Sequence, residues 1–359
     1  MTAQPTGHSA GAVDRAAGDV ATSGSVPTPA SAQDRGRQLA AEARQGSRRS
    51  LARLLTEVEN RTRAAEAALR DLYPLAGTAH LVGVTGAPGA GKSTLVAALV
   101  AEARTGGRPV AVLAIDPSSP ITGGAILGDR VRMQQHSGDR DVFIRSMASR
   151  GHVGGLAASS VAAAAVLDAS GFPLVFIETV GTGQSEVEIA SIADTTLVVQ
   201  APEMGDEVQA IKAGLLEVAD LVAVTKGDRP GADRAASHLR GMLTVGAQHD
   251  RAAGDRPRPK RPEVMLVSGV SGKGVPELLA ALDRRHAARG ASSQSGSDAE
   301  RARLARADAQ LSGILAERLR QRLHDAAHLP ATQATLRRIA AHEIDPYTAA
   351  DELLRSLGE

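Results

Sequence analysis

The eight residues Gly-Ala-Pro-Gly-Ala-Gly-Lys-Ser that end at Ser93 carry the strongest chemical signal in the sequence. Their spacing is that of a phosphate-binding loop, and they stand between an apolar run, HLVGVT, and an amphipathic segment. Glycines let backbone N–H groups converge on phosphate oxygens, and the following helix adds its positive end. Lys92 is expected to reach the β- and γ-phosphates, and Ser93 to offer its hydroxyl to Mg²⁺. The predicted nucleotide contacts in this loop are Gly86, Ala87, Pro88, Gly89, Ala90, Gly91, Lys92, Ser93 and Thr94.

The short sequence VTKGD ends a later apolar run and, taken alone, could be a solvated turn. Because VTKGD lies several strand–helix units after a phosphate loop, we instead predict that it recognises guanine. Asp228 would accept hydrogen bonds from N1–H and the exocyclic amine, a pair of donors that adenine lacks, and Lys226 would lie along the base. Thr225 stands where Asn is commoner. Ser268 and Gly269 follow the last apolar run and would place a loop amide near guanine O6.

Acidic residues after two other apolar runs predict a magnesium site. Glu178 ends PLVFIET and precedes Gly181 by three residues, the pattern of a ligand to Mg²⁺-bound water and a γ-phosphate-sensing amide, although most GTPases carry Asp there. Asp116 ends RPVAVLAID, and Asp129 lies in a glycine-rich segment; either could bind Mg²⁺, but a turn cap and a surface carboxylate are the alternatives. The predicted metal ligands are Ser93, Asp116, Asp129 and Glu178, and the predicted catalytic residues are Lys92, Glu178, Gly181 and, as a candidate for positioning water, Gln184.

The elements that must position these residues alternate from residue 80 onward, as short apolar runs separated by helical segments. Continuous apolar strands joined by helices predict a mainly parallel sheet covered on both faces. Ligands of such sheets bind beyond the carboxyl ends of the strands, where the candidate residues fall. We expect an α/β fold of the P-loop GTPase class, with additional N-terminal and C-terminal helices.

Composition and periodicity divide the chain into five expected parts. Residues 1–34 are rich in small and polar residues and are predicted to be disordered, whereas 35–78 have a helical period and are expected to form a pair of helices. The GTPase domain is expected over 79–289 and a flexible linker over 290–300. Residues 301–359 form an expected helical arm with an apolar stripe, Leu304, Leu311, Ile314, Leu315, Leu319 and Leu323.

The totals exclude several functional classes. Lys and Arg total 41 and Asp and Glu 40, so no surface suited to nucleic acid is expected, and two Tyr, three Phe and no Trp offer few platforms for base stacking. The absence of Cys excludes disulfides and thiolate metal sites. No signal peptide and no apolar run of about 18 residues is found, so we expect a cytoplasmic protein without a membrane span.

The chain resembles the MeaB/ArgK-type GTPases, the G-protein chaperones of adenosylcobalamin-dependent acyl-CoA mutases. The matching runs are AIDPSSPITGGAILGDRVRM, ETVGTGQSEVEIA, GDEVQAIKAGLLEVADL and TKGDRPGADRA, and the similarity extends from about residue 40 to the C-terminal tail. It implies a GTPase domain of the signal-recognition-particle type, with GTP, GDP and Mg²⁺ as ligands. It also implies hydrolysis that gates cofactor loading and protects or reactivates the mutase, and a homodimer formed through the C-terminal arm.

The same resemblance identifies QAPEMGDEVQAIK as a mobile switch that couples the nucleotide state to the mutase. Its predicted coupling residues are Glu203, Asp206 and Glu207, and family members often carry Gly at the position of Glu203. No cobalamin-binding DxHxxG run occurs, so the corrinoid would belong to the partner. The sequence does not identify which acyl-CoA mutase that is.

Two alternatives remain open. A metal-delivery GTPase of the nickel-enzyme type would need clusters of His or Cys, but this chain has no Cys and ten scattered His. A kinase would need an acceptor pocket and adenine specificity, and VTKGD argues against the second.

Overall fold

The structure is a computed structural model that describes residues 29–116, 138–148, 155–179, 185–202, 213–249, 262–292 and 330–358, together with parts of 304–323. Of the tail predicted over residues 1–34, residues 1–28 lie outside the described residues, and residues 29–34 belong to a helix. None of the described helices is long and apolar enough to cross a membrane.

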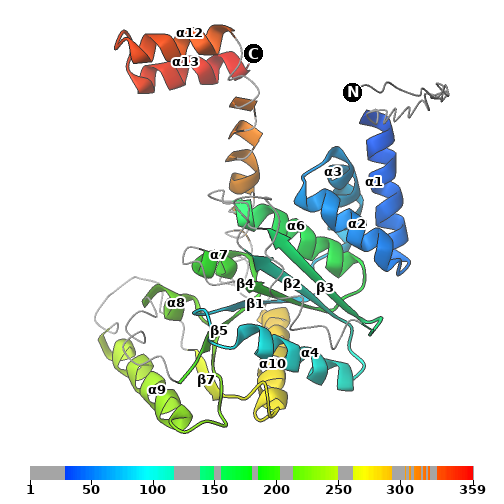
Figure 1. Cartoon of the computed structure of the whole chain (residues 1–359), viewed down its shortest axis with the longest axis vertical. Coiled ribbons are helices and arrows are strands. Elements are labelled where there is room, and N and C mark those ends of the chain that lie inside the picture. Colours follow the sequence, from blue (N-terminus) through cyan, green and yellow to red (C-terminus); the bar gives the residue numbers. More distant parts are fainter. Residues whose placement is uncertain are drawn as a thin grey trace, which may run out of the picture.

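Seven parallel strands form a single sheet, in the order β3-β2-β4-β1-β5-β6-β7 (Figure 1). The apolar runs of the sequence become strands, which confirms the expected α/β fold; they are HLVGVT, RPVAVLAID, DVFIR, PLVFIET, TTLVVQ, DLVAVT and EVMLVS. Their bounds are β1 His80–Thr85, β2 Val110–Asp116, β3 Val142–Ala148, β4 Leu174–Thr179, β5 Thr195–Gln200, β6 Leu221–Val224 and β7 Glu263–Leu266.

Helices cover both faces of the sheet because the strands are apolar on both sides. One buried cluster joins α4 (Lys92–Thr105) and α10 (Val275–Ser292) to side chains such as Val84 and Phe176. The opposite face is covered by α6 (Gly155–Ala169), α7 (Ser185–Ile192) and α9 (Ala232–His249). The short α8 (Ala213–Val218) precedes β6.

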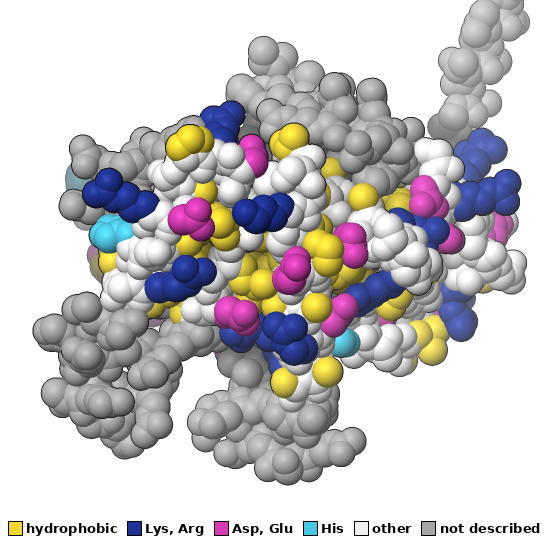
Figure 2. All heavy atoms as spheres, turned by 90° about the horizontal axis from the view of Figure 1, so that it is seen from below, with side chains coloured by type: hydrophobic (Ala, Val, Ile, Leu, Met, Phe, Trp, Pro, Cys, Tyr) yellow, Lys and Arg dark blue, Asp and Glu magenta, His cyan; other side chains and the backbone are white. Residues whose placement is uncertain are grey.

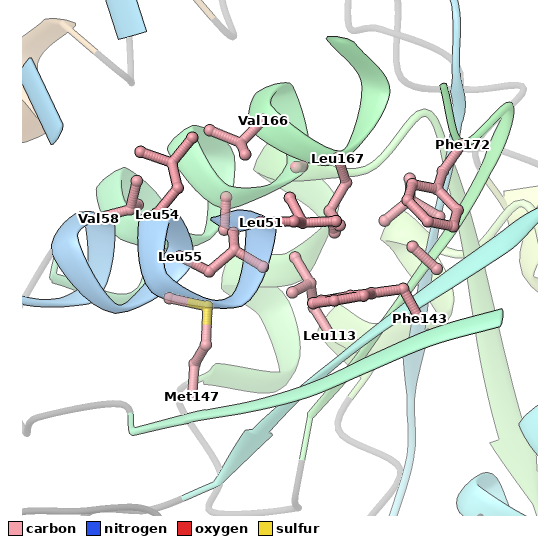
Figure 3. Packing of buried hydrophobic residues seen from close by; sticks show 14 of the residues in the cluster. Leu51, Leu54, Leu55, Val58, Leu113, Phe143, Met147, Val166, Leu167 and Phe172 are labelled. Atoms are coloured by element: carbon pink, nitrogen blue, oxygen red, sulfur yellow. The ribbon is translucent and has the colours of Figure 1, made fainter. Parts of the chain in front are cut away.

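Three helices precede the sheet, where the sequence predicts a helical pair: α1 (Pro29–Arg44), α2 (Arg48–Glu59) and α3 (Arg63–Leu72). The serine and threonine before α2 and α3 each cap the helix by accepting a hydrogen bond from a backbone N–H in its first turn. α1 begins before residue 35, at a proline, which suits the first turn of a helix. The apolar face of α2 packs against β3 and α6 in one continuous core (Figure 3). A 3-10 turn, η1 (Tyr73–Leu75), follows α3 and precedes β1.

The described C-terminal residues are helical and end in two adjacent helices, α12 (Pro330–Ala340) and α13 (Pro346–Gly358) (Figure 1). On the face seen from below, basic and acidic side chains lie interspersed around exposed hydrophobic ones (Figure 2). This mixture agrees with a formal net charge of only +1.

Candidate functional site

The phosphate loop connects the end of β1 directly to the first turn of α4. Gly86, at φ 140°, and Gly91, at φ 92°, have backbone angles that favour glycine. A Cβ atom on Gly86 would lie 2.1 Å from the carbonyl oxygen of Val199 on β5. No other residue would fit there without moving β5, so the glycine allows the loop to turn tightly over the sheet.

Lys92 is the first residue of α4 and is buried. Its Nζ donates hydrogen bonds to the carbonyl oxygens of Gly86, at 2.7 Å, and Ala87, at 3.1 Å. The ammonium group is therefore held above the loop whose N–H groups would face a phosphate chain. A strongly hydrated cation is costly to bury without such acceptors, and phosphate oxygens could replace them.

Ser93 and Glu178 form the shortest link between α4 and the sheet within this site. The Ser93 hydroxyl donates to Oε1 of Glu178 over 2.6 Å, and both residues are buried. Since the hydroxyl proton points to the carboxylate, the lone pairs of Ser93 Oγ are directed elsewhere. A hydroxyl oxygen beside a carboxylate is the donor chemistry that Mg²⁺ prefers, so these two residues fit the metal.

Three further polar side chains lie at the carboxyl ends of the central strands and were not singled out by the sequence analysis. Thr85, Thr179 and Gln200 are buried, and within the described residues Thr85 Oγ1, Thr179 Oγ1 and Gln200 Nε2 have no hydrogen-bond partner. Each is the last letter of an apolar run, the same signal that marks Asp116. The alternation along the strands puts all three on the face opposite α4, whereas Glu178 lies on the α4 face.

The second predicted group lies after β6 and β7. The Ser268 hydroxyl, together with the backbone N–H of Asp228, donates to the Asp228 carboxylate, and these bonds hold the pKa of Asp228 below its usual value. Lys226 adopts φ 54°, in the left-handed region, and Gly227 N donates to Val267 O at 2.9 Å. An exposed, ionised Asp228 can accept two hydrogen bonds from a ligand.

Two contacts join this group to the phosphate loop. Thr225 Oγ1 lies 2.6 Å from the carbonyl oxygen of Ala90 and 3.1 Å from that of Gln200. A Cβ atom on Gly269 would lie 2.9 Å from the carbonyl oxygen of Thr94, so this glycine permits close packing on the first turn of α4. The structure thus brings the predicted base and phosphate groups into one site.

Several predicted residues are not placed. Asp116 ends β2, in register with Ala148 of β3, and only its backbone is described. The sequence predictions for Asp129, Gly181, Gln184, Glu203, Asp206 and Glu207 lie outside the described residues. Within the part of the chain that is described, no three His, Asp or Glu side chains gather into a group able to hold a metal.

This sheet, with a glycine loop and a lysine at the start of a helix on its central strand, defines a P-loop nucleotide hydrolase of the GTPase class. The chain belongs to the MeaB family, whose family model, described as methylmalonyl Co-A mutase-associated GTPase, matches residues 51–328. It is accordingly a GTPase.

Individual relatives agree with this assignment. A candidate GTPase of Pyrococcus abyssi is 44% identical over 314 residues, which is 88% of this chain and 94% of that protein. GTPase ArgK of Escherichia coli is 44% identical over 189 residues, covering 52% of this chain and 57% of ArgK. A crystal structure of an LAO/AO transport system kinase superposes with a TM-score of 0.60 at 26% identity, covering 93% of this chain and all of that one.

Proposed function

We propose that this protein is a G-protein chaperone that uses GTP hydrolysis to assist an adenosylcobalamin-dependent acyl-CoA mutase. The observation that carries the proposal is the continuity of the site, in which Thr225 connects the Asp228 group to the loop containing Lys92. Membership of the mutase-associated family supports the choice of partner. A mitochondrial relative in Caenorhabditis elegans, the methylmalonic aciduria type A homolog, is 39% identical over 198 residues.

In this proposal Lys92 leaves its loop carbonyls and neutralises charge on the β- and γ-phosphates. Ser93 would coordinate Mg²⁺ with the lone pairs that its bond to Glu178 leaves available, and Glu178 would orient the hydroxyl and water held by the metal. The metal, when bound, would neutralise charge that develops between the two phosphates. Asp116 and Asp129 remain the candidates for further metal contacts.

Guanine would be recognised by Asp228, which accepts from N1–H and the exocyclic amine. Lys226 would cover one face of the base, and the Gly269 amide would donate to O6. Ser268 contributes by keeping Asp228 ionised and oriented. A ligand lacking these two donors would leave the carboxylate without partners, which is the physical basis of the proposed specificity.

The partner would respond to the nucleotide through Glu203, Asp206 and Glu207, which the sequence places after β5. A switch transmits only what it binds differently in two states. Replacing all three residues with Ala should leave intrinsic hydrolysis within a few-fold and remove most of the stimulation by the mutase. Equal stimulation of the triple variant and the wild type by purified mutase would exclude this segment as the coupling element.

Substitution of Lys92 is the most direct test of the proposed GTP hydrolysis. Lys92→Ala should abolish GTP turnover measured as phosphate release, whereas Lys273→Ala, a lysine outside the phosphate loop, should retain it. Hydrolysis at the wild-type rate by the Lys92 variant would show that the phosphate site is wrongly assigned. Failure of any purified acyl-CoA mutase to change the rate of the wild type would instead count against the chaperone role.

A further inference from the structure

Glu59, the last residue of α2, contacts the end of the edge strand β3. Its Oε1 accepts a hydrogen bond from the backbone N–H of Ala148 at 3.0 Å, and its Oε2 accepts from Arg145 Nη2 at 2.8 Å. The Glu59 side chain is 14% exposed and that of Arg145 is 16% exposed. Both carboxylate oxygens therefore accept hydrogen bonds. Glu59 and Arg145, which are 86 positions apart in the sequence, form a partly desolvated ion pair.

This contact is important because it lies at the end of a strand that pairs with β2. Ala148 is the last residue of β3 and lies in register with Asp116, the last residue of β2. Both strands end at the carboxyl edge, where Ser93 and Glu178 also meet. A group that fixes the end of β3 therefore also fixes the strand end that carries Asp116.

The other end of α2 is attached to the same strand. Arg48, its first residue, donates to the carbonyl oxygen of Arg140 at 2.6 Å and lies over the ring of Phe143, 5.5 Å from its centroid. Between the two ends, Leu51, Leu55 and neighbouring side chains pack against Phe143 and Met147 (Figure 3). The helix is therefore held along β3, with Glu59 as its anchor at the nucleotide edge.

We propose that Glu59 is a positioning residue for the magnesium-dependent nucleotide site. By holding Ala148, it keeps in place the paired end of β2, from which Asp116 would support the metal. The N-terminal helices then set how strongly Mg²⁺ tightens nucleotide binding. This inference rests on the proposed function, because it assigns a role to Asp116.

The variants separate this role from general stability. Glu59→Ala removes both hydrogen bonds and leaves Arg145 buried without its carboxylate. Glu59→Gln retains an oxygen for the Ala148 amide but loses the charge opposite Arg145. Arg48→Ala is the matched control, because it removes the anchor of the same helix on the same strand at the end away from the site.

Binding of a fluorescent GDP would be measured in Mg²⁺ and in EDTA, with thermal unfolding recorded for each variant. Glu59→Ala should weaken binding in Mg²⁺ about tenfold, within the range typical of coupling between two separate sites, and leave binding in EDTA within about twofold. Glu59→Gln should lie between Glu59→Ala and the wild type. Arg48→Ala should lower the unfolding temperature without changing the ratio of the two affinities.

Hydrogen exchange supplies a readout independent of the nucleotide. The Ala148 amide should exchange faster in Glu59→Ala than in the wild type, and in Arg48→Ala it should not. If Glu59→Gln and Glu59→Ala are both folded and neither changes the ratio of the affinity in Mg²⁺ to the affinity in EDTA, the inference is overturned. If the wild type itself binds no guanine nucleotide, the proposed function fails instead, so the two failures are distinguishable.

Discussion

The Thr225 hydroxyl donates to the carbonyl oxygen of Ala90 across 2.6 Å, joining residues 135 positions apart. Thr225 is buried, and its backbone N–H donates to Gln200 O at 2.8 Å. One side chain thereby ties the turn that carries Lys226 and Asp228 to the last residues of the phosphate loop. A displacement of the phosphate loop must then move the base-binding turn, and a displacement of that turn must move the loop.

This connection predicts the effect of removing the hydroxyl. Thr225→Val keeps the shape but leaves the Ala90 carbonyl without its donor, which should weaken GTP and GDP about five- to tenfold each. Thr225→Ser retains the donor and should stay near the wild type. Calorimetry with both nucleotides checks this, and unchanged affinities in Thr225→Val would show that the contact does not connect the two groups.

Base choice should depend on Asp228. Asp228→Asn replaces an acceptor with an amide that presents a donor, and it should weaken GTP binding by about 2–3 kcal/mol. Binding of xanthosine triphosphate should strengthen, because xanthine offers a carbonyl where guanine has its amine, and the Asn amide can donate to it whereas the carboxylate cannot. The comparison is made by competition against a fluorescent nucleotide, and wild-type protein that binds ATP as tightly as GTP would contradict the guanine assignment.

The apolar stripe of the arm predicts self-association. Leu304, Leu311, Ile314, Leu315, Leu319 and Leu323 are all exposed in the single chain, and burying such a stripe is favourable. Light scattering should give a homodimer for the full chain and a monomer for a truncation after residue 296. In the full-length chain, the double substitution Leu311→Ser and Leu315→Ser should weaken the dimer. A monomeric full-length chain would refute a role of the arm in dimerisation.

Stability should fall at mildly acidic pH because of His80. Burial lowers the pKa of His80 from 6.5 to about 3, with a smaller contribution from His286, whose ring stacks on it at 4.5 Å. Since the folded-state pKa lies below the unfolded one, the unfolded chain takes up the proton first as the pH drops. The free energy of unfolding is then unaffected above about pH 6.5 and decreases below it, by about 2 kcal/mol at pH 5.

Denaturant titrations at pH 7.5 and 5 would test this expectation. His80 Nε2 lies 2.8 Å from the hydroxyl oxygen of Thr195. His80→Gln, which can still form this hydrogen bond, should lose most of the pH dependence, whereas His238→Gln, at an exposed position on α9, should keep it. If the free energy of unfolding falls by the same amount between pH 7.5 and 5 in the wild type and in His80→Gln, the acid sensitivity arises from another group.

The sequence by itself determined the elements of this protein and the identity of its phosphate loop. Runs such as LVFI, which precedes Glu178, are apolar throughout and short, so they favour buried strands, and the glycine spacing before Lys92 has one well-known structural outcome. These properties depend on neighbouring residues, where backbone preference and periodicity act. The same local signals predicted two N-terminal helices rather than three, because the short turn at Gly46 does not interrupt the helical period.

Only the tertiary structure decided which distant groups meet. Nothing near Glu59 in the chain predicts that its carboxylate caps the end of β3, and nothing near Thr225 predicts its bond to Ala90. The burial of His80, which lowers its pKa, likewise arises because α10 covers the start of β1. Such contacts depend on strand order, register and the packing of helices over the sheet, and these follow from burying the whole apolar surface at once rather than from any local stretch.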